Sequence, residues 1–261
     1  MILTLTTDFG ADGLYVAAMK GVVLGLAPAT QIVDVSHAIP PQDVEAGAFV
    51  LAEVFDSFPA GTVHLAVVDP GVGTTRRLVV VELAGQWFVL PDNGLIGGVR
   101  KGREPSGAWE IQNPKLRREV VSATFHGRDI LAPVAAHLLN GGDPAEVGPR
   151  VDRLILLEAS GPTSTEDGWI GRIVFIDHFC NLITNLRAGQ LGPGEWLASV
   201  QGRPVGGLIR TYGDRPSGSV VALVGSTGRV EIAVVDGDAA KALGLGRGAS
   251  VVLRRTGVID S

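Results

Sequence analysis

The sequence contains a single cysteine, Cys180, and it also lacks long apolar runs and a strong excess of positive charge. One cysteine excludes both a disulfide framework and a zinc site built from cysteines. No apolar stretch approaches the roughly 20 residues that a membrane-spanning helix needs. A net charge of −5 argues against nucleic acid as the main partner. We therefore expect a protein that binds neither membranes nor nucleic acids.

Several common functional motifs are absent as well. There is no Gly-x-Ser-x-Gly elbow, no Gly-x4-Gly-Lys-Ser/Thr phosphate loop, and no Gly-x-Gly-x-x-Gly after the first predicted strand. Residues 1–8 have no basic start and reach a carboxylate too early for a signal peptide, so we expect a cytoplasmic protein. His37 and His64 have no helical i, i+4 partner that would support a metal site with Asp69, and no metal is expected.

Glycine, in contrast, is abundant, with 36 of 261 residues, which is about twice its usual share. The glycines follow no strict period, which excludes a collagen-like chain. We expect most of them to lie in tight turns between short elements. The length allows one large domain or two smaller ones, each with a core of its own.

The hydrophobic pattern before about residue 157 alternates between strands and helices. Short apolar runs predict strands at residues 3–6, 31–35 (a buried strand), 62–68, 78–83 and 87–90. Helical spacing predicts helices at residues 14–26, 43–55 (with Asp43 as the cap) and 128–139. This alternation indicates an α/β domain with an open, mostly parallel sheet.

The pattern changes after residue 157. Residues 159–168 are turn and loop formers and predict a linker. Short β-rich runs separated by glycine-rich turns follow at residues 169–176, 181–186, 197–200, 205–211, 220–224, 229–235 and 250–255, with one short helix at 239–243. We therefore expect an α/β domain over residues 1–160 that carries the catalytic residues, and a small all-β, barrel-like domain over residues 168–261.

Aspartates at strand ends are the first candidates for chemistry. Asp8 and Asp69 follow predicted strands, and ligands of open α/β sheets bind beyond the carboxyl ends of the strands. An aspartate there also commonly caps a turn, so either one alone is ambiguous. Asp34 lies inside its strand and is expected to be structural. Arg76 follows Asp69 by seven residues and would fix the orientation of its carboxylate, although a surface ion pair is the alternative.

Two further loops are ambiguous by themselves. Pro91-Asp-Asn-Gly-Leu95 fits a functional loop or merely a turn. His126, in Thr124-Phe-His-Gly-Arg-Asp129, precedes a predicted helix and fits a structural histidine or an acid–base residue equally well.

Five motifs together are much more specific. They are Thr7-Asp-Phe-Gly10 (followed by Tyr15-Val16 and Lys20-Gly21), Asp69-Pro-Gly-Val-Gly73, Pro91-Asp-Asn-Gly-Leu95, Thr124-Phe-His-Gly-Arg-Asp129 and Asp177-His-Phe-Cys-Asn-Leu-Ile-Thr-Asn185. In this order they resemble the S-adenosyl-L-methionine (SAM) hydroxide adenosyltransferase family, whose relatives include fluorinase and chlorinase. The resemblance extends from residue 7 to about residue 240.

The resemblance implies an N-terminal α/β domain and a C-terminal β-barrel. It also implies a homotrimer in which the substrate lies between the first domain of one subunit and the barrel of its neighbour. The implied reaction is displacement at the ribose 5′-carbon of SAM, which gives adenosine and methionine without a cofactor or a metal.

The resemblance also implies residue roles. The Asp–Arg–His set of the hydroxide-using branch matches Asp69, Arg76 and His126, which halide users lack, so the sequence resembles a hydrolase. The implied substrate contacts are Asp8 with the ribose hydroxyls, Asp177 with the methionine ammonium, Asn181 with the adenine edge, Ser226 with the methionine carboxylate and Phe179 against the adenosine.

Three positions depart from the family pattern. Gly13 stands where a second aspartate often lies, Cys180 replaces a glycine, and Thr227 replaces an arginine of the halide users. If the backbone at Cys180 needs a positive φ, the cysteine costs about 1 kcal/mol or more. Two alternatives remain open from the sequence: an adenosyl halide (chloride) synthase on the same fold, and a non-catalytic, trimeric nucleoside-binding protein.

Overall fold

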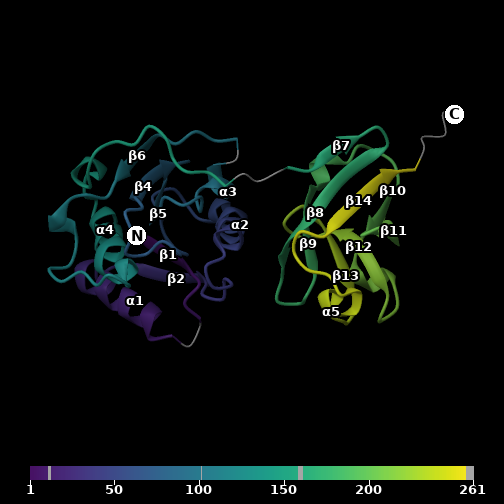
Figure 1. Cartoon of the computed structure of the whole chain (residues 1–261), viewed down its shortest axis with the longest axis horizontal. Coiled ribbons are helices and arrows are strands. Elements are labelled where there is room, and N and C mark those ends of the chain that lie inside the picture. The colour runs from purple at the N-terminus through teal and green to yellow at the C-terminus, as the bar shows by residue number, and fades with distance from the viewer. Residues whose placement is uncertain (11–12, 101, 158–160, 257–261) are drawn as a thin grey trace. The chain divides into compact units, whose positions relative to one another are not determined.

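The computed structural model describes residues 1–10, 13–100, 102–157 and 161–256 (Figure 1). The chain divides into two compact units, Met1–Glu158 and Ala159–Ser261. The first unit combines a sheet with helices, and the second consists mainly of strands. This arrangement confirms the predicted fold class.

The first unit is built on a six-stranded sheet with the order β2-β1-β3-β5-β4-β6. The first four strands in this order run parallel, and β4 pairs antiparallel with both β5 and β6. The bounds are β1 (Ile2–Thr7), β2 (Gln31–Ser36), β3 (Val63–Val67), β4 (Leu78–Leu83), β5 (Gln86–Pro91) and β6 (Gly107–Glu110). Because β1 and β3 are parallel neighbours, the loops after them leave the same edge of the sheet.

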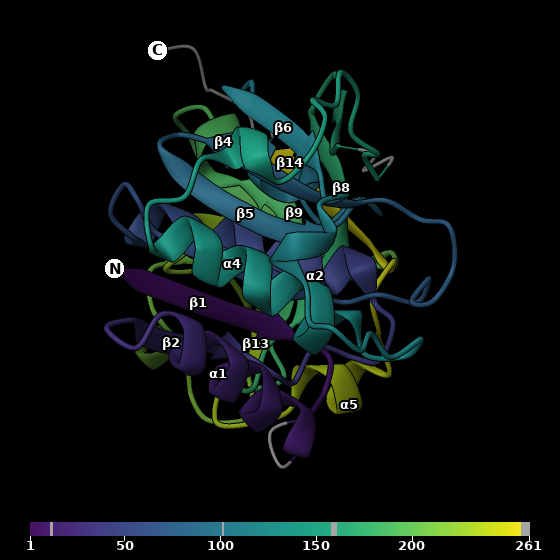
Figure 2. The same cartoon turned by 90° about the vertical axis from the view of Figure 1, so that its left-hand side faces the viewer.

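Helices cover both faces of this sheet (Figures 1 and 2). On one face α1 (Leu14–Leu26) packs against α4 (Ala132–Leu139), and on the other α2 (Val44–Val54) lies beside the short α3 (Gly97–Arg100). The buried residues of α1 are Val16, Met19 and Val23, which recur at helical spacing as predicted. A π-helical turn at Gly127–Leu131 leads into α4.

The predicted cap of α2 is confirmed. The Asp43 carboxylate accepts a hydrogen bond from the Ala46 backbone N–H at 2.9 Å, which satisfies one of the free donors at the start of the helix. Single 3-10 turns lie at Phe55–Ser57, Pro114–Leu116, Pro144–Glu146, Ala188–Gln190 and Tyr212–Asp214.

The prediction of a buried strand at residues 31–35 is wrong in its burial. β2 occupies this segment, but it is the edge strand of the sheet, and Val33 is 38% exposed. The strand β6 is not predicted because its four residues begin with glycine and alanine and show no apolar run.

The second unit is a closed barrel of seven strands to which a short eighth strand, β7, is added. The barrel order is β14-β10-β11-β12-β13-β9-β8, and pairing of β14 with β8 closes it. The bounds are β7 (Thr163–Thr165), β8 (Gly168–Ile176), β9 (Leu182–Arg187), β10 (Trp196–Val200), β11 (Arg203–Ile209), β12 (Val220–Val224), β13 (Arg229–Val234) and β14 (Ser250–Arg255), with the helix α5 at Ala239–Leu243. The predicted linker at 159–168 therefore contains a strand, β7, while residues 158–160 lie outside the described residues.

Candidate active site

A pocket of about 340 Å³ opens in the first unit where β1 and β3 end. Asp8 follows β1, Asp69 follows β3, and His126 comes from the segment just before α4. All three line this pocket. The fold thus brings together, at one edge of the sheet, three of the polar residues singled out in the sequence.

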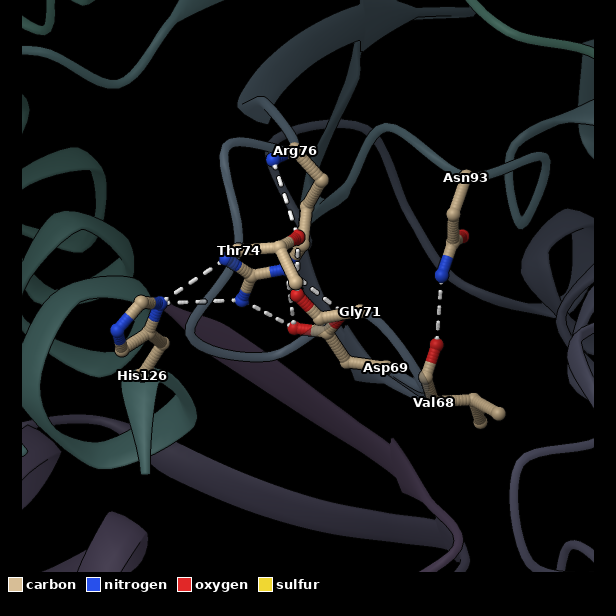
Figure 3. A network of polar contacts seen from close by, with 7 residues as sticks. All are labelled: Val68, Asp69, Gly71, Thr74, Arg76, Asn93 and His126. Atoms are coloured by element: carbon tan, nitrogen blue, oxygen red, sulfur yellow. Dashed lines mark hydrogen bonds and ion pairs between the residues drawn. The ribbon is translucent and has the colours of Figure 1, made fainter. Parts of the chain in front are cut away.

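Asp69 and Arg76 form a bidentate ion pair beside the pocket (Figure 3). Arg76 Nε donates to Asp69 Oδ1 at 2.8 Å and to Oδ2 at 2.9 Å, and Arg76 Nη2 also donates to Oδ2. The side chains are only 6% (Asp69) and 11% (Arg76) exposed, so this is not a solvated surface pair. Asp69 lines the pocket and Arg76 does not, which places the guanidinium behind the carboxylate.

Arg76 also contacts His126 and thereby determines which ring nitrogen carries the proton. Arg76 Nη1 and Nη2 both lie 3.1 Å from His126 Nδ1 (Figure 3). A guanidinium only donates, so Nδ1 accepts and the neutral ring carries its proton on Nε2. The pKa of His126 is lowered from its ordinary 6.5, first by burial and then by Arg76, against the opposing effect of Asp69 and Asp129. The site therefore holds a neutral imidazole with an Nε2–H donor.

The lowered pKa of His126 predicts a loss of activity in acid. As the pH falls through a value below 6.5, the ring gains a proton on Nδ1 and can no longer accept from Arg76. We expect kcat to fall on this acid limb and to be level above it, measured between about pH 5 and 9. In His126→Gln, which cannot titrate there, the acid limb should disappear. An acid limb that survives unchanged in the variant would assign it to another group.

Local contacts explain why the Asp69 loop takes this path. Asn93, from the Pro91–Leu95 motif, donates through Nδ2 to the Val68 carbonyl at 2.8 Å and anchors the chain just before Asp69 (Figure 3). The Thr74 hydroxyl donates to the Gly71 carbonyl at 2.7 Å and closes the loop. Gly73 has φ +79°, and a Cβ there would lie 2.5 Å from the Ala123 carbonyl oxygen. Glycine thus lets the loop approach the segment that carries His126.

Asp8 has a backbone partner from a separate loop. The Gln42 N–H donates to Asp8 Oδ2 at 2.7 Å, and Gln42 holds the uncommon left-handed conformation with φ +64°. Both residues line the pocket. The contact orients the carboxylate that the resemblance assigns to the ribose hydroxyls, and it leaves Oδ1 with no hydrogen bond from the described residues.

Three aromatic rings that sequence analysis gave no role form part of the pocket wall. The ring centroids of Phe9, Tyr15 and Phe125 lie 5.2–6.0 Å apart in tilted and edge-to-face contacts. Tyr15 is still 49% exposed. Each ring neighbours or belongs to one of the quoted motifs, but the patterns alone do not show that the three meet.

The second unit gathers a separate polar cluster. Asn181 donates to Asp177 through its backbone N–H at 2.8 Å and its side-chain Nδ2 at 3.1 Å. Its Nδ2 also lies 3.4 Å from the Tyr212 hydroxyl, which in turn donates to Glu231. Asp177 and Asn181 were predicted as site residues, whereas Tyr212 and Glu231 were not, since they lie far away in the sequence.

The other predicted barrel residues are placed as follows. Ser226 lies exposed in the turn between β12 and β13, and Phe179 is 74% exposed in the turn between β8 and β9. Cys180 has φ +63°, so this position does adopt the conformation that favours glycine.

No group of three or more histidine, cysteine, aspartate or glutamate side chains in the described part of the chain could hold a metal ion. His64 is fully buried between Thr4 Oγ1 at 2.7 Å and Gln86 Oε1 at 2.5 Å, and it stacks on Phe88. His37 lies near Thr7 and Asp34. Within the described residues, no helix is both long and apolar enough to cross a membrane.

The fold and the site together define a class of two-domain protein. An α/β unit holds a carboxylate, a guanidinium and an imidazole at or beside a pocket, and a closed β-barrel follows it in the sequence. The family models for the N-terminal and C-terminal domains of SAM hydroxide adenosyltransferase match residues 3–148 and 171–252. The chain belongs to this family.

Proteins of known name support the same placement. The chain is 42% identical to "(R)-S-adenosyl-L-methionine hydrolase" of Salinispora tropica, over 93% of this chain and 94% of that protein. It is 41% identical to the protein of the same name from Thermus thermophilus, over 95% and 97%. A fluorinase of Nocardia brasiliensis is 31% identical over 73% of this chain and 72% of its own. The solved structure of an uncharacterised conserved protein from Thermotoga maritima has a TM-score of 0.90 to this chain and is 34% identical to it. The aligned region covers 98% of this chain and 100% of that protein's chain.

Proposed function

We propose that the protein hydrolyses SAM to adenosine and L-methionine. The observation that carries this proposal is the shielded Asp69–Arg76–His126 network beside the pocket. The names of the relatives with about 40% identity support it. The fluorinase relative is more distant, so a hydrolase is favoured over a halide synthase.

The proposed reaction is an in-line displacement at the ribose 5′-carbon. A lone pair of the water oxygen forms the C5′–O bond while the C5′–S bond breaks, and its electron pair goes to sulfur. The sulfonium leaves as the neutral thioether of methionine, so the leaving group needs no acid. The water proton passes to Asp69 or through it to solvent.

The three residues act on the attacking water, because water is a poor nucleophile and its reactivity limits the reaction. Asp69 accepts a hydrogen bond from the attacking water and aligns it, and the Arg76 fork fixes the carboxylate that does so. The Nε2–H of His126 is a second group that can hold the same water, as a donor to its oxygen, while the water proton passes to Asp69. Both water-facing groups are thus set in place by one arginine.

We further propose that the enzyme is a homotrimer and that Asp8, Asp177, Asn181, Ser226 and Phe179 bind the substrate. Two exposed rings fit this proposal, Phe179 in the turn that also holds Asp177 and Asn181, and Tyr15 at the pocket, because a nucleoside bound with the help of another copy of the chain would cover both. The reaction as written involves no redox step and no cofactor.

Incubation of the purified protein with SAM tests the proposed function. Chromatography should show adenosine and methionine in equal amounts, with the same rate in the presence of a metal chelator. Added chloride should not yield 5′-chloro-5′-deoxyadenosine from SAM. Binding of SAM without any turnover would instead favour a nucleoside-binding protein, and a chlorinated product would favour the halide synthase.

A further inference from the structure

Tyr212 and Glu231 extend the Asp177–Asn181 pair into a chain of hydrogen bonds within the barrel. Tyr212 OH donates to Glu231 Oε1, and Asn181 Nδ2 lies 3.4 Å from Tyr212 OH and 3.1 Å from Asp177 Oδ2. The proposed function gives roles to Asp177 and Asn181 but none to the other two residues. Asn181, the side chain that is expected to contact the adenine, lies between Tyr212 and Asp177 in this chain.

The hydrogen bonds in this chain have one direction. The carboxylate of Glu231, which is only 6% exposed, accepts the single proton of the Tyr212 hydroxyl, so the phenol oxygen accepts from Asn181. The pKa of Tyr212 is raised by burial and then by Glu231, which keeps the phenol protonated. Burial and the charge of Asp177 raise the pKa of Glu231, while the bond from Tyr212 favours its ionised form.

This direction determines how the Asn181 amide is turned. Tyr212 and Asp177 both accept, so the amide points its NH₂ group at them, and the two protons on Nδ2 have partners. Asn181 Oδ1 receives no hydrogen bond from the described residues. The amide thus offers a ligand an acceptor and no donor.

A purine base meets this acceptor differently according to its substituent at C6. A 6-amino group donates a hydrogen bond to Oδ1, whereas a 6-oxo group places one acceptor against another. We propose that Tyr212 and Glu231 are positioning residues that hold the Asn181 oxygen toward the base and make the site selective for 6-amino over 6-oxo purines. This inference rests on the proposed function and on contact between Asn181 and the base.

Glu231 is held in place from its other side. A Cβ at Gly225 would lie 2.1 Å from Glu231 Oε2, so the carboxylate packs directly against the turn that carries Ser226. The same side chain therefore fixes Tyr212 and abuts a second loop with a proposed substrate residue. A buried carboxylate with two such neighbours has little freedom to turn away from the phenol.

The test compares kcat/KM for SAM with kcat/KM for its 6-oxo analogue, S-inosyl-L-methionine, using the whole chain. We expect the unmodified protein to prefer SAM by on the order of 100-fold, because a 6-oxo group leaves a buried acceptor facing another acceptor. Tyr212→Phe removes one of the two acceptors that orient the Asn181 amide. Glu231→Gln can present either its oxygen or its NH₂ group to Tyr212, so the direction of the phenol hydrogen bond is no longer fixed. Each should reduce the preference about 10-fold, roughly 1.4 kcal/mol of discrimination.

The ratio separates positioning from simple damage to the fold, which would slow both substrates equally. Glu195→Gln, an exposed glutamate in the same unit, is the matched control and should keep the preference. If both variants retain the full preference while SAM is still hydrolysed, the inference is overturned and the proposed function stands. If neither the unmodified protein nor any variant hydrolyses SAM, the proposed function fails. The inference is then decided separately by calorimetry, which compares the binding of adenosine and inosine to the same proteins.

Discussion

Replacing Asp69 with asparagine is expected to slow SAM hydrolysis by about 10²- to 10³-fold while SAM binding changes only a few-fold. Asparagine has nearly the same shape, so the pocket should keep its outline. Its NH₂ group, however, faces a donor of Arg76 in either orientation of the amide, and the charge that pairs with Arg76 is lost. The attacking water then loses a fixed acceptor. The rate is measured as adenosine formed, and binding by calorimetry.

Asp56→Asn is the matched control for this substitution. Asp56 pairs with Arg103 on the surface, where its side chain is 66% exposed, and it takes no part in the pocket. The control should retain full activity. Full activity in Asp69→Asn would show that Asp69 is not needed for the chemical step and would remove the mechanism proposed for this site.

Arg76→Lys is expected to lower kcat by on the order of 10- to 100-fold, because lysine keeps the charge but loses the planar fork. Arg76 donates at the same time to both oxygens of Asp69 and to His126 Nδ1. A single ammonium cannot reproduce this geometry. The effect should be larger on kcat than on KM, since Arg76 does not line the pocket.

A surface arginine provides the comparison for this variant. Arg103→Lys preserves an exposed ion pair with Asp56 and should leave kcat unchanged. Thermal denaturation of both variants shows whether either has lost its fold. Unchanged kcat in a folded Arg76→Lys variant would mean that charge alone, and not the shared fork, is sufficient.

The sequence predicts the participants of the catalytic set better than their arrangement. Asp69 and Arg76 are close in the chain, and the strand before Asp69 is a clear apolar run, so their pairing is predictable. His126 lies 50 positions after Arg76, and only the motif order connects them. The structure shows in addition that Arg76 contacts both Asp69 and His126 without lining the pocket itself. Such a relation depends on how a loop packs, which no local pattern records.

In the barrel, the strands can be predicted from the sequence but the contacts between distant segments cannot. Its strands are predictable because alternating apolar runs and glycine-rich turns mark them, yet closure by β14 and β8 joins segments about 80 residues apart. The approach of Glu231 to Asn181 depends in the same way on the pairing of β13 with β9, which places Glu231 opposite Ile183. At Cys180 the replaced glycine only raises the question of a positive φ, and the structure answers it with φ +63°.

The edge strand β2 illustrates why burial is harder to predict than secondary structure. Its apolar run fits a strand in the middle of a sheet as well as one at the edge, and position in the sheet depends on the order of all strands. The abundance of glycine has a double cause: some glycines, such as Gly73, allow loops of the site to approach one another, and others end the short strands of the barrel.

The most direct test of water attack at the 5′-carbon is hydrolysis of SAM in water enriched in ¹⁸O, followed by mass spectrometry of both products. The proposed mechanism predicts one ¹⁸O atom in the 5′-hydroxyl of adenosine and none in methionine. Unlabelled adenosine, or label in methionine, would contradict attack by water at this carbon.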